Sequence, residues 1–74
     1  MSRKSRLKKE IKTCQKTIVE IERRRSRSQS ALVQAILLQE EPNDQDVEWF
    51  NKYTGEITAC RNHMLELKKE LESL

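Results

Sequence analysis

Apolar and amphipathic residues recur at alternating intervals of three and four through the second half of the chain. The members of this repeat are Phe50, Tyr53, Ile57, Cys60, Met64, Leu67, Leu71 and Leu74. A spacing that averages 3.5 residues places all of them on one side of an α-helix that packs against another helix, whereas a strand would alternate with a period of two. The repeat therefore predicts a helix over about residues 45–73.

The first half carries the same repeat less completely. Its positions hold Leu7, Ile11, Cys14, Ile18 and Ile21, then Arg25 and Ser28, and then Leu32 with Ala35 or Ile36. Because Arg and Ser do not forbid a helix, we predict one continuous helix over about residues 5–39, preceded by a basic N-terminal tail of residues 1–5. The alternative is a kink or short break at residues 26–30, with Ser30 capping a second helix.

Residues 40–44 form the one convincing turn. Pro42 disfavours helical backbone at Glu41 and has no N–H to donate to a continuing helix. Asn43 or Asp44 then supplies a side-chain acceptor for the first N–H groups of the next helix. Because a turn this short joins antiparallel neighbours, the chain of 74 residues is predicted to be a single all-α domain, a coiled-coil-like antiparallel two-helix hairpin.

A fold at residues 42–43 predicts which residues face each other. The expected pairs are Ile36 with Trp49 or Phe50, Leu32 with Tyr53, Ile21 with Met64, Ile18 with Leu67, and Cys14 with Leu71. Leu7 would then extend past Leu74, so that the basic N-terminal turn overhangs the open end. Cys60 would lie opposite Arg25, too far from Cys14 for a disulfide.

The apolar residues outnumber those that one helix–helix stripe can bury. The segment 31–38 is apolar almost all round its helix, and a chain this small rarely buries enough surface to fold well alone. We therefore expect a bundle completed by a second copy or by a helical partner protein. The residues expected to bind this partner are Leu32, Ile36, Trp49, Phe50 and Tyr53.

The charges are divided between the two halves of the chain. Residues 1–30 carry eleven Lys or Arg and three Glu, whereas residues 31–74 carry four Lys or Arg and nine Asp or Glu. Such a division fits either a solvated helix face or an electrostatically steered contact. In the second case the contact residues for an anion or a nucleic acid are Arg3, Lys4, Arg6, Lys8 and Lys9, and the alternative function is a homodimeric four-helix bundle that binds nucleic acid through its basic N-terminal half.

The residues that catalysis or cofactor binding requires are not gathered in this sequence. His63 is the single histidine and Gly55 the single glycine, so a held base beside a nucleophile and a Gly-rich phosphate loop are not expected. Cys60 and His63, with Cys14 as a distant third, fall short of the four convergent ligands of a structural zinc site. We expect no enzyme activity, no cofactor, no metal and no small-molecule substrate.

Two further features complete the expectations. Gly55 lies inside the second predicted helix, either as a tolerated substitution or as a site where another helix approaches closely.

Neither a membrane-spanning stretch nor an apolar signal region is recognisable, so a cytoplasmic protein with free thiols is expected.

The plan of the chain resembles the small helical-hairpin co-chaperones that hold needle subunits of type III secretion systems. The shared features are the length, a long first helix, a short turn, and aromatic residues near the start of the second helix, here Trp49, Phe50 and Tyr53. This resemblance implies a chaperone- or adaptor-like function with another helical protein as the partner. The plan is also similar to that of plasmid-encoded helical-hairpin dimers that bind RNA.

Overall fold

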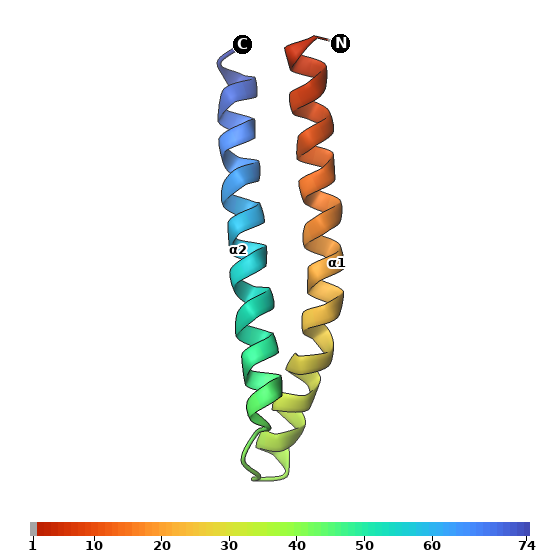
Figure 1. The fold of residues 1–74 in the computed structure, drawn as a ribbon, viewed down its shortest axis with the longest axis vertical. Coiled ribbons are helices and arrows are strands. Elements are labelled where there is room, and N and C mark those ends of the chain that lie inside the picture. The colour runs from red at the N-terminus through yellow and green to blue at the C-terminus, as the bar shows by residue number, and fades with distance from the viewer. Residues whose placement is uncertain (1) are drawn as a thin grey trace.

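A computed structural model describes residues 2–74 as two long helices joined by a short loop (Figure 1). Helix α1 comprises Arg3–Leu37 and helix α2 comprises Asp44–Glu72. The helices run antiparallel and form a rod of 54 × 17 × 16 Å, with both chain ends side by side at one end. The prediction of an all-α two-helix hairpin is confirmed.

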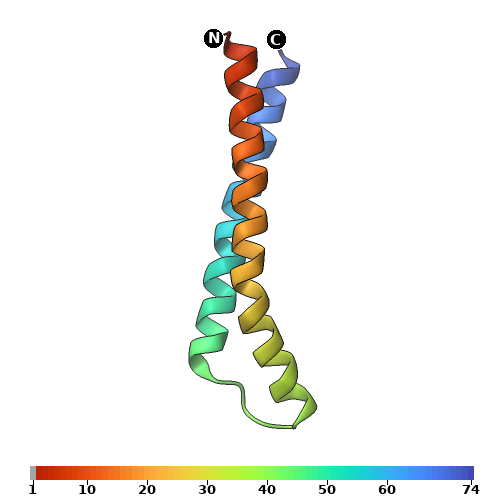
Figure 2. The ribbon, with the colours of Figure 1, turned by 90° about the vertical axis from the view of Figure 1, so that its right-hand side faces the viewer.

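The first helix begins with a serine cap. The Ser2 hydroxyl accepts a hydrogen bond from the Ser5 backbone N–H at 3.2 Å, and this satisfies one of the free donors of the first turn. Residues 3–5, expected to be part of a tail, are thus helical, and Met1 lies outside the described residues. The helix then continues through residues 26–30, so a break with a new cap at Ser30 is wrong. The axis of α1 does bend near these residues, away from α2 (Figure 2).

The end of α1 is a Schellman motif. Gln39 adopts a left-handed conformation with φ 57°, and the Glu40 N–H bonds the Ala35 carbonyl at 2.9 Å. The Gln39 N–H bonds the Ile36 carbonyl at 3.1 Å, which completes the motif. This cap turns the chain away from the helix axis after Leu38, earlier than Pro42 alone would require.

The second helix begins as its sequence predicts. The Asn43 side chain accepts a hydrogen bond from the Gln45 backbone N–H at 2.8 Å. Asp44 and Asp46 lie in the first turn, where the helix dipole stabilises negative charge.

The heptad positions form the contact between the helices. The buried apolar residues are Leu7, Ile11, Ile18 and Ile21 of α1 with Ile57 and Leu67 of α2, and the half-buried residues packed against them are Cys14, Tyr53, Cys60, Met64 and Leu71. The predicted stripes are thus confirmed, except at Leu74, which is 58% exposed. We call this contact the seam.

The predicted pairing across the seam is wrong by one heptad. Leu67 packs with Leu7 and Ile11, not with Ile18. Ile21 packs against Ile57, where Met64 was expected. As a result Leu7 is buried, the two chain ends lie level with each other, and the unpaired overhang falls at the turn (Figures 1 and 2).

The overhang leaves the last turns of α1 without a partner helix. The end of α1 extends beyond the start of α2, and the two helices diverge toward the turn (Figure 2). The Schellman motif and the loop to Asn43 then bridge the gap between them. Residues 33–38 therefore cannot bury their apolar side chains against α2.

The shifted pairing also changes the surroundings of the thiols. Cys60 packs against Ile18, Ile21 and Ile57, and it does not lie opposite Arg25. Cys14 packs against the neighbouring cluster of Leu7, Ile11 and Leu67, and Met64 packs against both clusters. Both thiols are free. Burial raises the pKa of the Cys14 thiol, and negative charge on Cys60 and Glu10 raises it further.

Candidate functional site

Exposed apolar side chains gather at the turn end of the hairpin. Ile36 is 72% exposed and Leu37 is 77% exposed, in the part of α1 that has no helix beside it. The full set is Val33, Ile36 and Leu37 of α1, the capping residue Leu38, and Trp49 of α2, and we call it the tip surface. Because exposed apolar residues grouped on a protein surface mark interaction sites, the tip surface is the first candidate for function.

The five residues predicted to bind a partner are divided between the tip surface and the seam. Ile36 and Trp49 are exposed. Leu32, Phe50 and Tyr53 are half-buried, and Tyr53 packs against the Ile18–Ile57 cluster. The predicted contacts of Ile36 with the aromatic residues are not formed, because the heptad shift places Phe50 under Arg25 and Trp49 beside Arg27 and Ser28.

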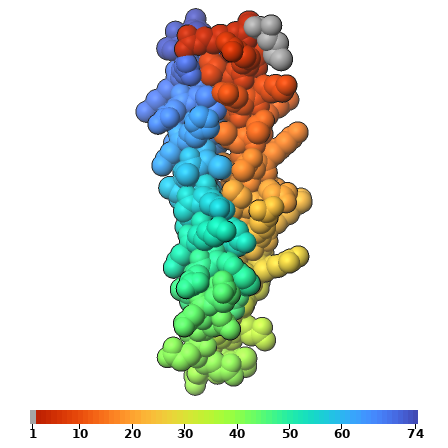
Figure 3. Space-filling view, in the orientation of Figure 1, coloured from red at the N-terminus to blue at the C-terminus, as the bar shows by residue number. Residues whose placement is uncertain are grey.

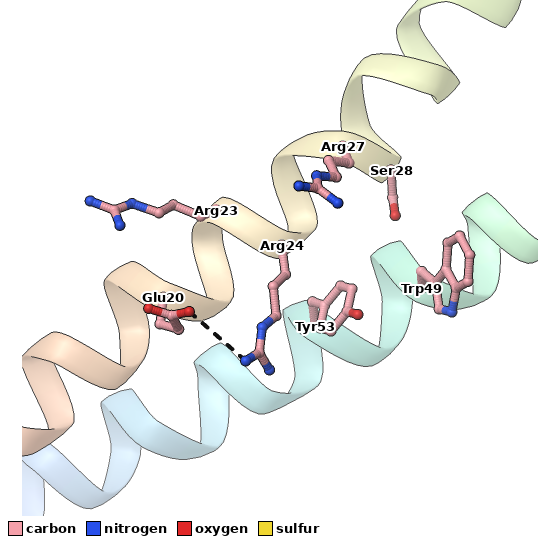
Figure 4. Close-up of a pocket in the computed structure, with 7 residues that line it drawn as sticks. All are labelled: Glu20, Arg23, Arg24, Arg27, Ser28, Trp49 and Tyr53. Carbon is pink, nitrogen blue, oxygen red and sulfur yellow. Dashed lines mark ion pairs between the residues drawn. The ribbon is translucent and has the colours of Figure 1, made fainter.

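Arginines of α1 and aromatic residues of α2 together line an open pocket of about 490 Å³. Its lining consists of Glu20, Arg23, Arg24, Arg27, Ser28, Trp49 and Tyr53, and we call it the arginine groove. Figure 4 shows Tyr53 of α2 near Arg24 and Trp49 of α2 near Ser28, while Arg23 is directed outward and Arg27 points away from Trp49. Ser28 is 2% exposed and allows the two helices to approach at this level.

The arginine groove is electrostatically unbalanced. Arg24 has one carboxylate near it, Glu20 at 3.9 Å, which is a weak contact between exposed groups. Within residues 2–74, Arg23 and Arg27 form no ion pair. The groove therefore presents guanidinium groups beside an exposed indole, an arrangement that suits an anionic partner with apolar or planar groups.

The arginine groove was not recognised in the sequence. Its residues lie on two helices, and only the pairing of the helices brings Trp49 and Tyr53 next to Arg24 and Arg27. The predicted pairing placed the aromatic residues one heptad nearer the turn. The signal that was available is the unusual density of arginine at positions 23–27.

The basic residues near the N-terminus are exposed but do not form one face. At 100° per residue, Arg3, Lys4, Arg6, Lys8 and Lys9 point to all sides of α1. Arg3 is also engaged in an ion pair with Glu70 of α2. A flat polyanion would therefore meet only part of this set at one time.

Neither a metal-binding cluster nor a membrane-spanning helix is present in the described residues. No group of three or more His, Cys, Asp or Glu side chains within residues 2–74 is placed to hold a metal ion. In the same range, neither helix has a stretch that is both long and apolar enough to cross a membrane.

The space-filling view shows α1 and α2 in contact along the rod, with long side chains projecting along the outer edge of α1 (Figure 3). The molecule is thus an all-α antiparallel hairpin that exposes an apolar tip surface and an adjoining arginine groove. No protein-family model, curated protein or solved structure matches the chain.

Proposed function

We propose that the protein is a non-enzymatic protein-binding module, a chaperone- or adaptor-like hairpin that docks a helix of another protein on its tip surface. The observation that carries the proposal is the exposure of Ile36, Leu37, Leu38 and Trp49 at the point where the helices diverge. An amphipathic helix of a partner protein buries its apolar side against exposed apolar residues of this kind.

The tip surface contains a residue type that contributes strongly to the free energy of protein–protein binding. Trp49 is large, half-exposed and fixed on α2, and tryptophan is enriched among the residues that dominate interface energetics. A needle-subunit co-chaperone of type III secretion is one form of this function, because its partner would be an apolar helix of another small protein.

The proposal is tested by site-specific cross-linking in the native cell. A photoreactive phenylalanine analogue at Leu37 should cross-link one defined protein, whereas the same analogue at Leu65, an exposed residue of α2 away from the tip, should not. Mass spectrometry then identifies the partner, and the binding constant is measured with purified proteins. Trp49→Ala should weaken binding by about 2 kcal/mol or more, roughly a 30-fold rise in Kd.

The matched controls are Val19→Ala and Leu65→Ala, which shorten exposed apolar side chains outside the tip surface. Both variants should bind the partner with unchanged affinity. A partner that binds the Trp49→Ala and Leu37→Glu variants as tightly as the wild type would show that the tip surface is not the docking site.

Nucleic-acid binding is the second candidate, and the arginine groove is the observation that favours it. Single-stranded nucleic acids bind to grooves in which cationic side chains meet the backbone and aromatic rings stack on bases. Here Arg23 and Arg27 would contact phosphates while Trp49 offers a stacking surface. The test is a mobility shift with a single-stranded RNA oligonucleotide at low salt, where Arg23→Ala with Arg27→Ala should abolish the shift and Lys4→Ala with Lys8→Ala should only weaken it.

A further inference from the structure

We infer that a second copy of this chain occupies the tip surface when no other partner is bound, in an antiparallel dimer in which only the turn ends overlap. The inference rests on the proposed function in that it assigns an occupant to the same surface. In this dimer the acidic loop of each copy contacts the arginine groove of the other. Binding of a partner protein then competes with self-association.

The first argument is charge complementarity within one molecule. The turn region carries Glu40, Glu41, Asp44, Asp46 and Glu48, and no Lys or Arg lies between residues 40 and 48. The arginine groove lies farther along the same rod, with Arg23 and Arg27 unpaired in the described part of the chain. One rod therefore carries an anionic patch and a cationic patch. When a second rod runs in the opposite direction, the anionic patch of each copy can meet the cationic patch of the other.

An antiparallel pair of copies can match both patches about one two-fold axis. Along α1, Arg24 lies thirteen residues before Leu37, or about 20 Å at 1.5 Å per residue, and the acidic loop follows directly after Leu38. A two-fold axis that crosses the rod between these two levels places the acidic loop of one copy near the arginines of the other. By symmetry the same contact forms twice, as in any isologous interface.

The second argument is the position of the apolar residues between these patches. Leu37 follows Arg23 by two heptads, so the two residues lie on the same side of α1. Trp49 borders the groove on that side. The symmetric contact thus has apolar residues near its axis and charged residues at its edge, which is the usual anatomy of a stable interface.

Other arrangements of two copies leave these patches unmatched. A parallel pair places the arginines of one copy against those of the other. A full-length antiparallel bundle places Ile36 and Leu37 of one copy beside the first, charged turn of α1 in the other, near Arg3 and Lys4. The carboxylates of the acidic loop also repel a nucleic acid strand that runs past the tip. When only the turn ends overlap, opposite charges meet and the apolar residues of the tip surface are covered at the same time.

The test uses two charge-reversed variants of the full chain. The first carries Arg23→Glu, Arg24→Glu and Arg27→Glu, and the second carries Glu40→Arg and Glu41→Arg. Sedimentation velocity should show a dimer for the wild type and a dimer dissociation constant raised at least tenfold for each variant alone. An equimolar mixture of the two variants should restore the dimer, because each acidic patch then meets a basic one at both contacts.

The mixture protects the result against simple misfolding, since an unfolded variant cannot be rescued by a second one. Lys4→Glu with Lys8→Glu is the matched control and should leave the dimer unchanged; loss of the dimer in this control would show the full-length bundle instead. A wild type that is monomeric at about 100 µM, the upper range of weak association, overturns the inference. So does a mixture that stays monomeric while both variants are helical by circular dichroism.

The outcomes also separate this inference from the proposed function. A monomeric wild type that still cross-links a partner through Leu37 removes the dimer and leaves the protein-binding function. Loss of single-stranded RNA binding in the arginine variant, with the dimer intact, would assign the arginine groove to nucleic acid and overturn the dimer contact.

Discussion

The guanidinium of Arg25 lies 5.6 Å from the centroid of the Phe50 ring, at a position of the seam where the heptad repeat calls for an aliphatic side chain. The same group donates a hydrogen bond to the Thr54 hydroxyl at 3.2 Å. Arg25 thus replaces apolar packing with a cation–π contact and a hydrogen bond. The helices stay close as far as the buried Ser28, and beyond it they diverge toward the turn (Figure 2).

The Arg25–Phe50 contact should contribute measurable coupling energy. In a double-mutant cycle of Arg25→Met and Phe50→Leu, we expect the two residues to stabilise each other by about 0.5–1 kcal/mol. The free energies of unfolding are obtained from urea titrations followed by circular dichroism, at a chain concentration where the hairpin is monomeric. Effects of the two substitutions that simply add would contradict this prediction.

Ile57 should be the most sensitive apolar position of the seam. It is 1% exposed and packs against Ile18 and Ile21, so Ile57→Ala should lower the free energy of unfolding by about 2–5 kcal/mol. If that variant is unfolded at 25 °C, Ile57→Val, with an expected loss of about 0.5–1.5 kcal/mol, gives the graded measurement. Leu65→Ala is the exposed control and should change stability by no more than about 0.5 kcal/mol.

The left-handed residue at the end of α1 offers a stabilising substitution. Gln39 holds φ 57° in a position where glycine carries no steric penalty, so Gln39→Gly should raise the free energy of unfolding by about 0.5–1 kcal/mol. A β-branched residue is strained in this conformation, and Gln39→Val should lower stability. Thermal unfolding of the three proteins checks the order; equal melting temperatures would mean that Gln39 is not left-handed in solution.

A substitution at Gly55 can test whether a partner helix packs closely against this position. A Cβ atom built on Gly55 meets no other atom of the described chain within 4 Å, so Gly55→Ala should stabilise the monomeric hairpin by about 1 kcal/mol through helix propensity. The same variant tests whether another helix approaches Gly55 closely in a complex. Weaker partner binding by Gly55→Ala, with a more stable free hairpin, would show such an approach, and unchanged binding would show a merely tolerated glycine.

The Cys14 thiol should make stability depend on pH in the alkaline range. Burial raises its pKa above the ordinary value of 9.0, so the folded chain holds this proton more tightly than the unfolded chain. The corresponding stability is fully present below pH 9 and is lost as the pH rises through the pKa of the folded state. Between pH 8 and pH 10.5, the wild type should therefore lose more unfolding free energy than Cys14→Ala. Parallel pH profiles for the two proteins would contradict this.

The heptad repeat was sufficient to predict the helices and the seam. The residues from Phe50 to Leu71 and from Leu7 to Ile21 pack as their spacing indicates, because burial of an apolar stripe is a local property of each helix. The Asn43 cap was also readable, since a side-chain acceptor after a proline marks a helix start. These features depend on residues close together in the sequence and not on how the two helices pair.

The pairing of the helices was not readable for a physical reason. A shift of seven residues returns every seam residue to the seam, so the heptad pattern alone does not distinguish Ile21–Met64 from Ile21–Ile57. The choice is made by the turn, where the Schellman motif ends α1 at Leu37. Its left-handed position holds Gln39, and without a glycine the sequence gives little sign of it. The arginine groove depends on the same choice and was missed with it.

The two chain ends of this rod lie side by side, far from the tip surface. The hairpin can therefore be inserted into one surface loop of a host protein, because the two ends of the insert lie close together. Fluorophores or affinity handles attached at the ends stand some 50 Å from whatever the turn holds, a distance set by the 1.5 Å rise of the helices. The rod thus keeps labels at the helix ends well away from the tip surface.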